Sequence, residues 1–154
     1  MASKSNGSIY TQLKKDHQEL KKILKQMVGS KESEGAKRKK LLREFKENLL
    51  AHALAEEKLL YTELERHKRS HDLALEAEEE HHVAVLMLRE LEQCDVADEH
   101  WKAKATVLKE MLEHHIEEEE DEMFATAHRV LDKDMEQEMA QRFPQQKQQE
   151  IRAL

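Results

Sequence analysis

The same histidine–glutamate pattern occurs twice in this chain, at a constant offset of 63 residues. His52 is followed four residues later by Glu56, and His115 is followed four residues later by Glu119. In both copies a second Glu comes directly after the first, and an aromatic residue follows five positions after the first. Residues four apart on a helix project from the same face, so each copy can offer one nitrogen and one oxygen to a metal ion. The repeat therefore predicts helices that carry two halves of a metal site.

A shorter pair, an acidic residue followed by a histidine, precedes each copy. Asp16-His17 lies ahead of the first copy, and Glu80-His81 lies ahead of the second at an offset of 64 residues. We therefore expect two helical hairpins, each with a His on its first helix and a His/Glu pair on its second. Two such hairpins, facing each other across a pseudo-two-fold axis, would enclose two metal ions.

The composition leaves little room for anything but helices. The 154 residues include only 3 glycines and 1 proline, whereas Leu, Glu, Lys, Ala, Gln and Met are abundant and favour helices. The length fits one domain that is large enough for a real core. We predict an all-α fold, an up-down-up-down four-helix bundle with a short C-terminal fifth helix.

Hydrophobic periodicity sets the expected limits of the helices. The first three long helices are expected at about residues 8–28, 36–68 and 71–93; Asp95 and Asp98 form a capping arrangement for the fourth, which is expected to run to about residue 128. The fifth helix, at about residues 132–143, is expected to stop at Pro144. The predicted domain plan is a disordered N-terminus at 1–7, a bundle at 8–143 and a flexible or frayed tail at 144–154.

Charge and cysteine content limit the partners and the compartment. The formal net charge is −7, from 33 acidic and 26 basic residues, and no basic stripe with interleaved aromatic residues is present, so no nucleic-acid partner is expected. A lone Cys94 cannot form an internal disulfide, and the first residues lack an apolar run, which favours a cytoplasmic location. No stretch reaches the roughly 18 apolar residues of a membrane span, so no membrane partner is expected. The sequence identifies no protein partner.

Adjacent histidines leave two ligand assignments to be decided by the repeat. The alignment of the two copies favours His115 over His114. The spacing of the apolar residues that follow favours His81 over His82. The expected ligands are therefore His17, His52, Glu56, His81, His115 and Glu119, one from each matching position of the two hairpins.

The donor atoms narrow the choice of metal. Imidazoles with carboxylates suit iron, zinc, manganese or cobalt, and the thiolates of a structural zinc site are missing. Sharing between two ions would avoid leaving Glu56 and Glu119 as unpaired buried anions. Glu57 and Glu120, one residue further on, can be read as partners of the ligands, as alternative ligands or as a charged rim, and the rim is favoured.

These motifs resemble those of the hemerythrin-like (HHE cation-binding) domains. The resemblance covers about residues 8–128, and it implies a non-haem di-iron centre with carboxylate bridges, to which an oxo bridge can be added. The motifs that carry it are Asp16-His17, His52 with Glu56, Glu57 and Tyr61, Glu80-His81, and His115 with Glu119, Glu120 and Phe124. It implies His17, His52, His81 and His115 as iron ligands, with Glu56 and Glu119 as the bridging carboxylates.

One position departs from the pattern of the oxygen-carrying hemerythrins. Those proteins have a fifth His one turn after the third-helix ligand, and here that position is Val85. Without that histidine the two irons would be nearly equivalent, which argues against pure oxygen carriage. Solvent, Glu57, Glu120 or Tyr61 would then complete the metal shell.

The resemblance thus implies a di-iron protein that binds or reacts with a small molecule, namely oxygen, peroxide or nitric oxide. Its role would be redox or gas sensing, or peroxide detoxification, and as an enzyme it would be a peroxide-consuming oxidoreductase. The alternative is an iron-responsive or zinc-binding interaction module without redox catalysis.

Overall fold

The computed structural model describes residues 7–154, which are helical almost throughout and contain no strand, as the composition predicts. Residues 1–6, most of the predicted disordered N-terminus at 1–7, lie outside the described residues. The elements are α1 (Ile9–Gly29), α2 (Gly35–Glu56), η1 (Glu57–Tyr61), α3 (Thr62–Leu64), α4 (His71–Gln93), α5 (Glu99–Glu118), η2 (Glu119–Met123), α6 (Phe124–Val130) and α7 (Lys133–Arg152). None of these helices is long and apolar enough to cross a membrane.

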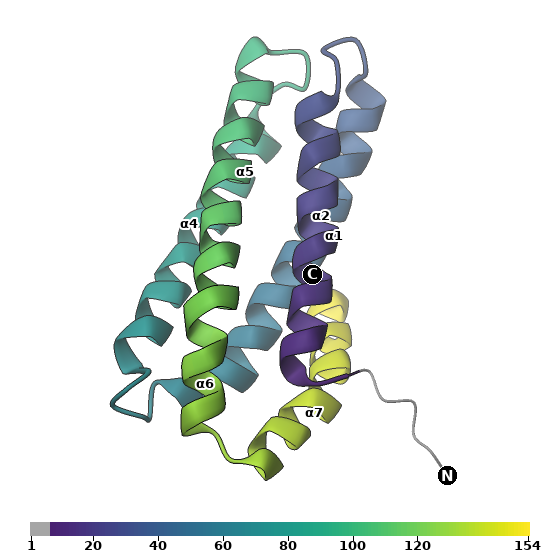
Figure 1. Ribbon diagram of the computed structural model, residues 1–154. Coiled ribbons are helices and arrows are strands. Elements are labelled where there is room, and N and C mark those ends of the chain that lie inside the picture. The colour runs from purple at the N-terminus through teal and green to yellow at the C-terminus, as the bar shows by residue number, and fades with distance from the viewer. Residues whose placement is uncertain (1–6) are drawn as a thin grey trace.

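Four long rods lie side by side in a helical bundle (Figure 1). The rods are α1, the run from α2 through η1 to α3, α4, and the run from α5 through η2 to α6. The α1–α2 loop and the α4–α5 loop lie at one end of the bundle, and the connection between α3 and α4 lies at the other. α7 packs mainly against α1 and α2, so it covers one side of the first hairpin.

The core consists of two apolar clusters with a polar layer between them. Along α1, for example, Leu13 belongs to one cluster and Leu20 to the other, and the buried His17 lies between them. The same change of cluster occurs along α4 between Ala77 and Ala84, on either side of the buried His81. Polar ligand candidates are therefore held at mid-height, with packed apolar side chains above and below.

Each rod that carries the repeated pattern contains one π-helical turn next to its ligand glutamate. The backbone amide of Phe124 donates to the carbonyl of Glu119, five residues earlier, and the amide of Thr62 does the same to Glu57. An α-helix turns once in 3.6 residues, so an aromatic residue five positions after the Glu would point well away from it. The wider π turn brings it back to the same side. The five-residue spacing in the sequence therefore matches a local change of helix type.

The C-terminal helix is longer than the sequence predicts, and its expected end at Phe143 is wrong. α7 continues through Pro144 to Arg152, so residues assigned to a flexible or frayed tail form its last turns. A proline inside a helix leaves the carbonyl four residues earlier without its amide partner, here Ala140. The side-chain amide of Gln12 on α1 donates to that carbonyl at 2.8 Å. A contact from another helix thus satisfies the group that Pro144 orphans.

A buried arginine ties the two hairpins together at the loop end of the bundle. The Arg38 guanidinium is buried, donates to the hydroxyl of Ser30 at 2.8 Å, and donates to the carbonyl of Val96 at 2.6 Å. It also lies 4.5 Å from the ring centroid of the fully buried Trp101, where a cation is attracted to the ring face. These contacts join the α1–α2 loop to the α4–α5 loop and fix the register of the two halves.

Candidate metal centre

The structure brings all six predicted ligand residues together in the polar layer. None of them is more than 3% exposed. Their donor atoms form two groups, and within each group the atoms lie within 4.8 Å of one another. One group consists of His17, His52, Glu56 and Glu119, and the other of Glu56, His81, His115 and Glu119. Both glutamates belong to both groups, whereas each pair of histidines belongs to one.

Several of these donor atoms lack a hydrogen-bond partner. His17 Nε2 lies 3.1 Å from Glu119 Oε1, yet neither atom has a partner with hydrogen-bond geometry. His115 Nε2 and Glu56 Oε2 are also buried and unpartnered. Buried polar atoms in proteins are almost always satisfied, so four such atoms in one cluster require an explanation. Bound cations would satisfy all four, so the donor set fits metal ions.

Each of the four histidines is oriented by a carboxylate on its other ring nitrogen. In the first hairpin, Nδ1 of His17 donates to Glu120 at 2.7 Å and Nδ1 of His52 donates to Asp16 at 2.9 Å. In the second, Nδ1 of His81 donates to Glu57 at 2.8 Å and Nδ1 of His115 donates to Glu80 at 2.7 Å. This bond places the proton on Nδ1 and leaves Nε2 free to bind metal. The favoured interpretation of Glu57 and Glu120 as a charged rim is therefore wrong, because both orient ligand histidines.

The same four carboxylates explain the form of the sequence repeat. Asp16 directly precedes His17 but orients His52 on the neighbouring helix, and Glu80 directly precedes His81 but orients His115. The second Glu of each pattern likewise reaches a histidine on an adjacent rod. Both members of each acidic–histidine and Glu-Glu pair therefore belong to the site. The carboxylate of each acidic residue that is not a ligand orients a histidine on a different rod.

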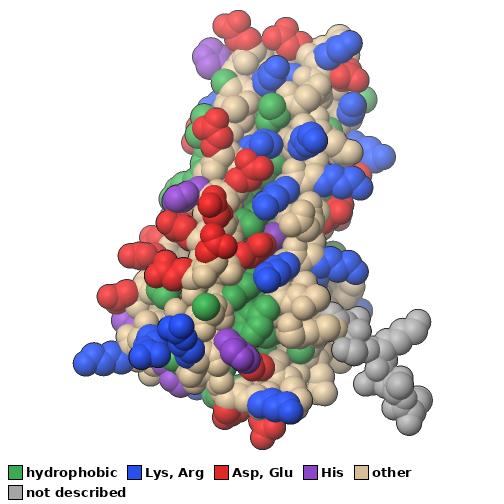
Figure 2. Space-filling model, viewed as in Figure 1, with side chains coloured by type: hydrophobic (Ala, Val, Ile, Leu, Met, Phe, Trp, Pro, Cys, Tyr) green, Lys and Arg blue, Asp and Glu red, His purple; other side chains and the backbone are tan. Residues whose placement is uncertain are grey.

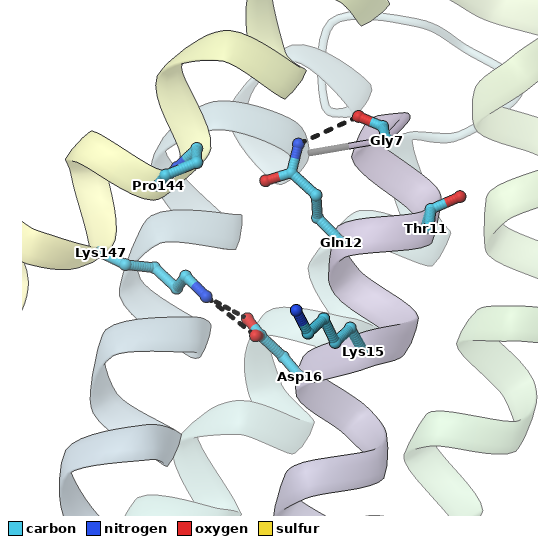
Figure 3. Close-up of a pocket in the computed structure, with 7 residues that line it drawn as sticks. All are labelled: Gly7, Thr11, Gln12, Lys15, Asp16, Pro144 and Lys147. Carbon is cyan, nitrogen blue, oxygen red and sulfur yellow. Dashed lines mark hydrogen bonds and ion pairs between the residues drawn. The ribbon is translucent and has the colours of Figure 1, made fainter. Parts of the chain in front are cut away.

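Lys147, which the sequence analysis does not single out, holds one of these orienting carboxylates, Asp16. Its Nζ atom contacts Asp16 Oδ1 at 2.8 Å and Oδ2 at 3.1 Å, as Figure 3 shows. Lys147 also lies 4.9 Å from the ring centroid of Phe143, so α7 holds it in place. Burial alone would raise the pKa of the Asp16 carboxyl. The hydrogen bonds and positive charges of His52 and Lys147 outweigh burial and lower this pKa.

Tyr61 and Phe124 occupy equivalent positions but differ in chemistry. Phe124 stacks on the ring of His17, with centroids 6.2 Å apart and an interplanar angle of 8°. Tyr61 stacks on His81 at 5.2 Å, and its hydroxyl donates to Glu56 at 3.0 Å and to Glu119. Burial, with the negative charges of these two carboxylates, raises the pKa of Tyr61 well above its usual value. The phenol therefore keeps its proton and acts as a hydrogen-bond donor between the two shared carboxylates.

Buried charges shift the pKa values of the metal-free cluster in a consistent direction. Burial alone would lower the pKa of His52, but the carboxylates of Glu56 and Asp16 outweigh it and raise the pKa to about 10. Burial opposes the charge of His81 in the same way, and Glu56 and Glu57 raise its pKa to about 9. For Glu56, burial favours the neutral acid, yet the neighbouring imidazoles hold its pKa well below the usual value. Without metal, protons on His52 and His81 balance the buried carboxylates.

Other residues that the sequence raises as possible metal ligands lie outside the two donor groups. His82 and His114, which the repeat sets aside, are exposed on the surface. Val85, at the position of a fifth histidine, is partly buried and packs against the apolar cluster on the loop side of the site. Neither donor group includes Cys94, which ends α4.

Comparison with known proteins identifies one family. The model for the hemerythrin HHE cation-binding domain matches residues 8–127. No curated protein and no solved structure gives a significant match to the chain. The matched residues include all six members of the two donor groups and all four orienting carboxylates, whereas α7 lies beyond them.

The metal-free protein should lose stability as the pH rises above neutral. The folded-state pKa values of His52 and His81, about 10 and about 9, exceed the 6.5 of an ordinary histidine. Their contribution to stability is therefore complete below about pH 6.5 and is lost as the pH rises through 9 to 10. Urea unfolding of metal-free protein from pH 6.5 to 10 should show a falling midpoint, and the metal-loaded protein a smaller fall. A midpoint that stays flat or rises without metal would contradict this assignment.

Neutralising an orienting carboxylate should weaken metal binding. Asp16→Asn and Glu57→Gln keep the side-chain shape but remove the charge behind His52 and His81. Loss of such a partner typically weakens metal affinity about 10- to 100-fold, measurable by competition with a chelator. Glu19→Gln, at an exposed position on α1, is the matched control and should bind metal like the wild type. Unchanged affinity in both test variants would mean that these carboxylates do not tune the ligands.

Proposed function

The chain belongs to the hemerythrin HHE cation-binding domain family, and from this we propose that it holds two non-haem iron ions that bind or react with oxygen, peroxide or nitric oxide. The observation that carries the proposal is the sharing of Glu56 and Glu119 by both donor groups. A carboxylate has two oxygens and can bridge two ions, so the arrangement suits a pair of cations held by two common bridges. His17 and His52 would hold one ion, and His81 and His115 the other.

The charge of the site supports a pair of cations over a single one. Two carboxylates buried in an apolar bundle are costly unless they are paired, and in the metal-free state imidazolium protons supply the pairing. Two divalent ions would replace those protons and balance the carboxylates around them. The nitrogen and oxygen donors suit iron, and when bound, iron supplies one-electron redox chemistry and coordination of small molecules.

The number of donors supports reactivity at the centre. Each ion would receive two imidazole nitrogens and oxygens from the two bridges, which leaves coordination positions for solvent or a small molecule. Glu57 and Glu120 are each engaged with a histidine Nδ1 atom, so Tyr61 or solvent is the better candidate to complete the shell. The Tyr61 hydroxyl holds its proton between the two bridges, where it can donate to a small molecule bound beside them.

Metal analysis of matched histidine variants tests the proposal. Protein from iron-supplemented cells should contain about two irons per chain, because each donor group offers two imidazole nitrogens and two carboxylates. His115→Ala removes a ligand and should reduce the iron content to about one or less. His114→Ala changes the exposed neighbouring histidine and should retain the wild-type content. Zinc in place of iron, or equal metal loss in both variants, would defeat the di-iron proposal and favour a metal-binding interaction module.

The response of the loaded protein to peroxide then separates the two roles. Sustained loss of peroxide over many equivalents, with iron retained, would identify a peroxide-consuming enzyme. A spectral change that stops after about one equivalent per centre would identify binding or sensing. Tyr61→Phe, which copies the Phe124 position of the other half, should slow the response if the phenol donates to the bound molecule.

A further inference from the structure

The two halves of the centre differ in the surface that lies over them. A cavity of about 70 Å³ lies between α4 and the α5–η2 rod, a volume that holds about two water molecules. Two of its lining residues are the ligands His115 and Glu119. Four further carboxylates line it, from Glu76, Glu80, Glu118 and Glu122. The cavity therefore connects an acidic opening to one of the two donor groups.

The equivalent region of the first hairpin is closed. At the offsets of the repeat, Glu76, Glu118 and Glu122 correspond to Gln12, Ala55 and Leu59. These three residues are buried, with exposed fractions of 7%, 0% and 8%. The carboxylates of one hairpin are thus replaced by an amide and two apolar side chains in the other.

α7 covers this closed side. The Gln12 amide donates to the carbonyl of Ala140, and the buried ring of Phe143 lies 6.2 Å from that of His52. The groove beside α7 is lined by Asp16 and Lys147 but by none of the six ligand residues (Figure 3). The Lys147–Asp16 ion pair lies between this groove and His52. On the first hairpin an ion pair and α7 therefore lie over His52, whereas on the second a cavity reaches His115 and Glu119.

Charge on the surface favours the open side for cations. Acidic side chains gather over the middle of the molecule on the α5 side, whereas Lys and Arg follow the α1 side (Figure 2). The run from Glu117 to Glu122 consists of six acidic residues. A cleft lined by one sign of charge raises the local concentration of the opposite ion and its rate of entry. At the cavity, the buried Nε2 atom of His115 has no hydrogen-bond partner and is available to an arriving cation.

From the cavity, its closed counterpart and the unpartnered His115, we propose that divalent cations enter the centre through the acidic cavity between α4 and the α5–η2 rod. The ion held by His81 and His115 is filled first and exchanges faster, and α7 retains the ion held by His17 and His52. This inference rests on the proposed function only in requiring that the centre binds cations.

Rapid-mixing measurement of Co²⁺ uptake by the metal-free protein tests the route, with Co²⁺ absorbance as the signal. The triple variant Glu76→Gln/Glu118→Gln/Glu122→Gln, called the port variant below, removes three carboxylates that line the cavity and are not ligands. Uptake should slow about tenfold at low salt, because focusing of the cation by the cleft is reduced. The difference should shrink at high salt, where exposed charges are screened. The final Co²⁺ content should equal that of the wild type.

A charge-matched control and a steric variant make the result specific. Glu19→Gln/Glu32→Gln/Glu47→Gln neutralises three exposed carboxylates outside the cavity and outside the acidic run at 117–122, and it should change the rate less than about twofold, since the net charge is the same as in the port variant. Ala77→Leu copies Leu13, its counterpart in the closed hairpin, into the cavity wall and should slow uptake at every salt concentration. Circular dichroism confirms that each variant is folded.

The outcomes separate the two claims. Wild-type rates in the port variant and in Ala77→Leu, with full Co²⁺ binding, would overturn the entry route and leave the metal centre intact. Equal slowing by the port variant and its control would also overturn it, because general charge would then be the cause. Failure of the wild-type protein to bind Co²⁺ would overturn the metal centre and the route together.

Discussion

The burial of two carboxylates, Glu56 and Glu119, in the middle of an apolar bundle is the constraint on which the rest of the structure depends. An unpaired charge in such a place costs several kcal/mol, so each carboxylate needs positive partners from every side. Without metal, the raised pKa values of His52 and His81 make these two imidazoles the positive partners, and a tyrosine hydroxyl donates between the two carboxylates. Protons on His52 and His81 offset part of the cost of this polar layer without metal, and bound cations would offset it more completely.

Support for that layer extends outward in successive contacts. Each histidine is oriented by a carboxylate from a neighbouring rod, and on one side Lys147 of α7 fixes the carboxylate in turn. The two hairpins share the inner arrangement, but α7 packs mainly on the first. The correspondence between the two hairpins therefore holds for the ligand residues and fails at the surface, so the two donor groups have different surroundings.

The sequence was sufficient to predict the helical fold and the residues that come together. Residues four apart lie on one face of a helix, and the alignment of the two copies selects the matching residues in each. It placed His115 inside and His114 outside, as the structure does. It could not assign Glu57 and Glu120, because their histidines lie on other rods and become neighbours only through packing. The continuation of α7 past Pro144 was missed for the same reason, since it depends on the distant Gln12. That two irons occupy the site remains a prediction.

Anomalous X-ray diffraction at the iron absorption edge, from crystals of the iron-loaded protein, tests the central claim most directly. We expect two peaks separated by about 3.5 to 4 Å, the usual spacing of paired metal ions. One peak should lie beside His17 and His52, the other beside His81 and His115, with Glu56 and Glu119 in contact with both. A single peak, or peaks only at exposed histidines such as His82, would contradict a shared two-ion centre.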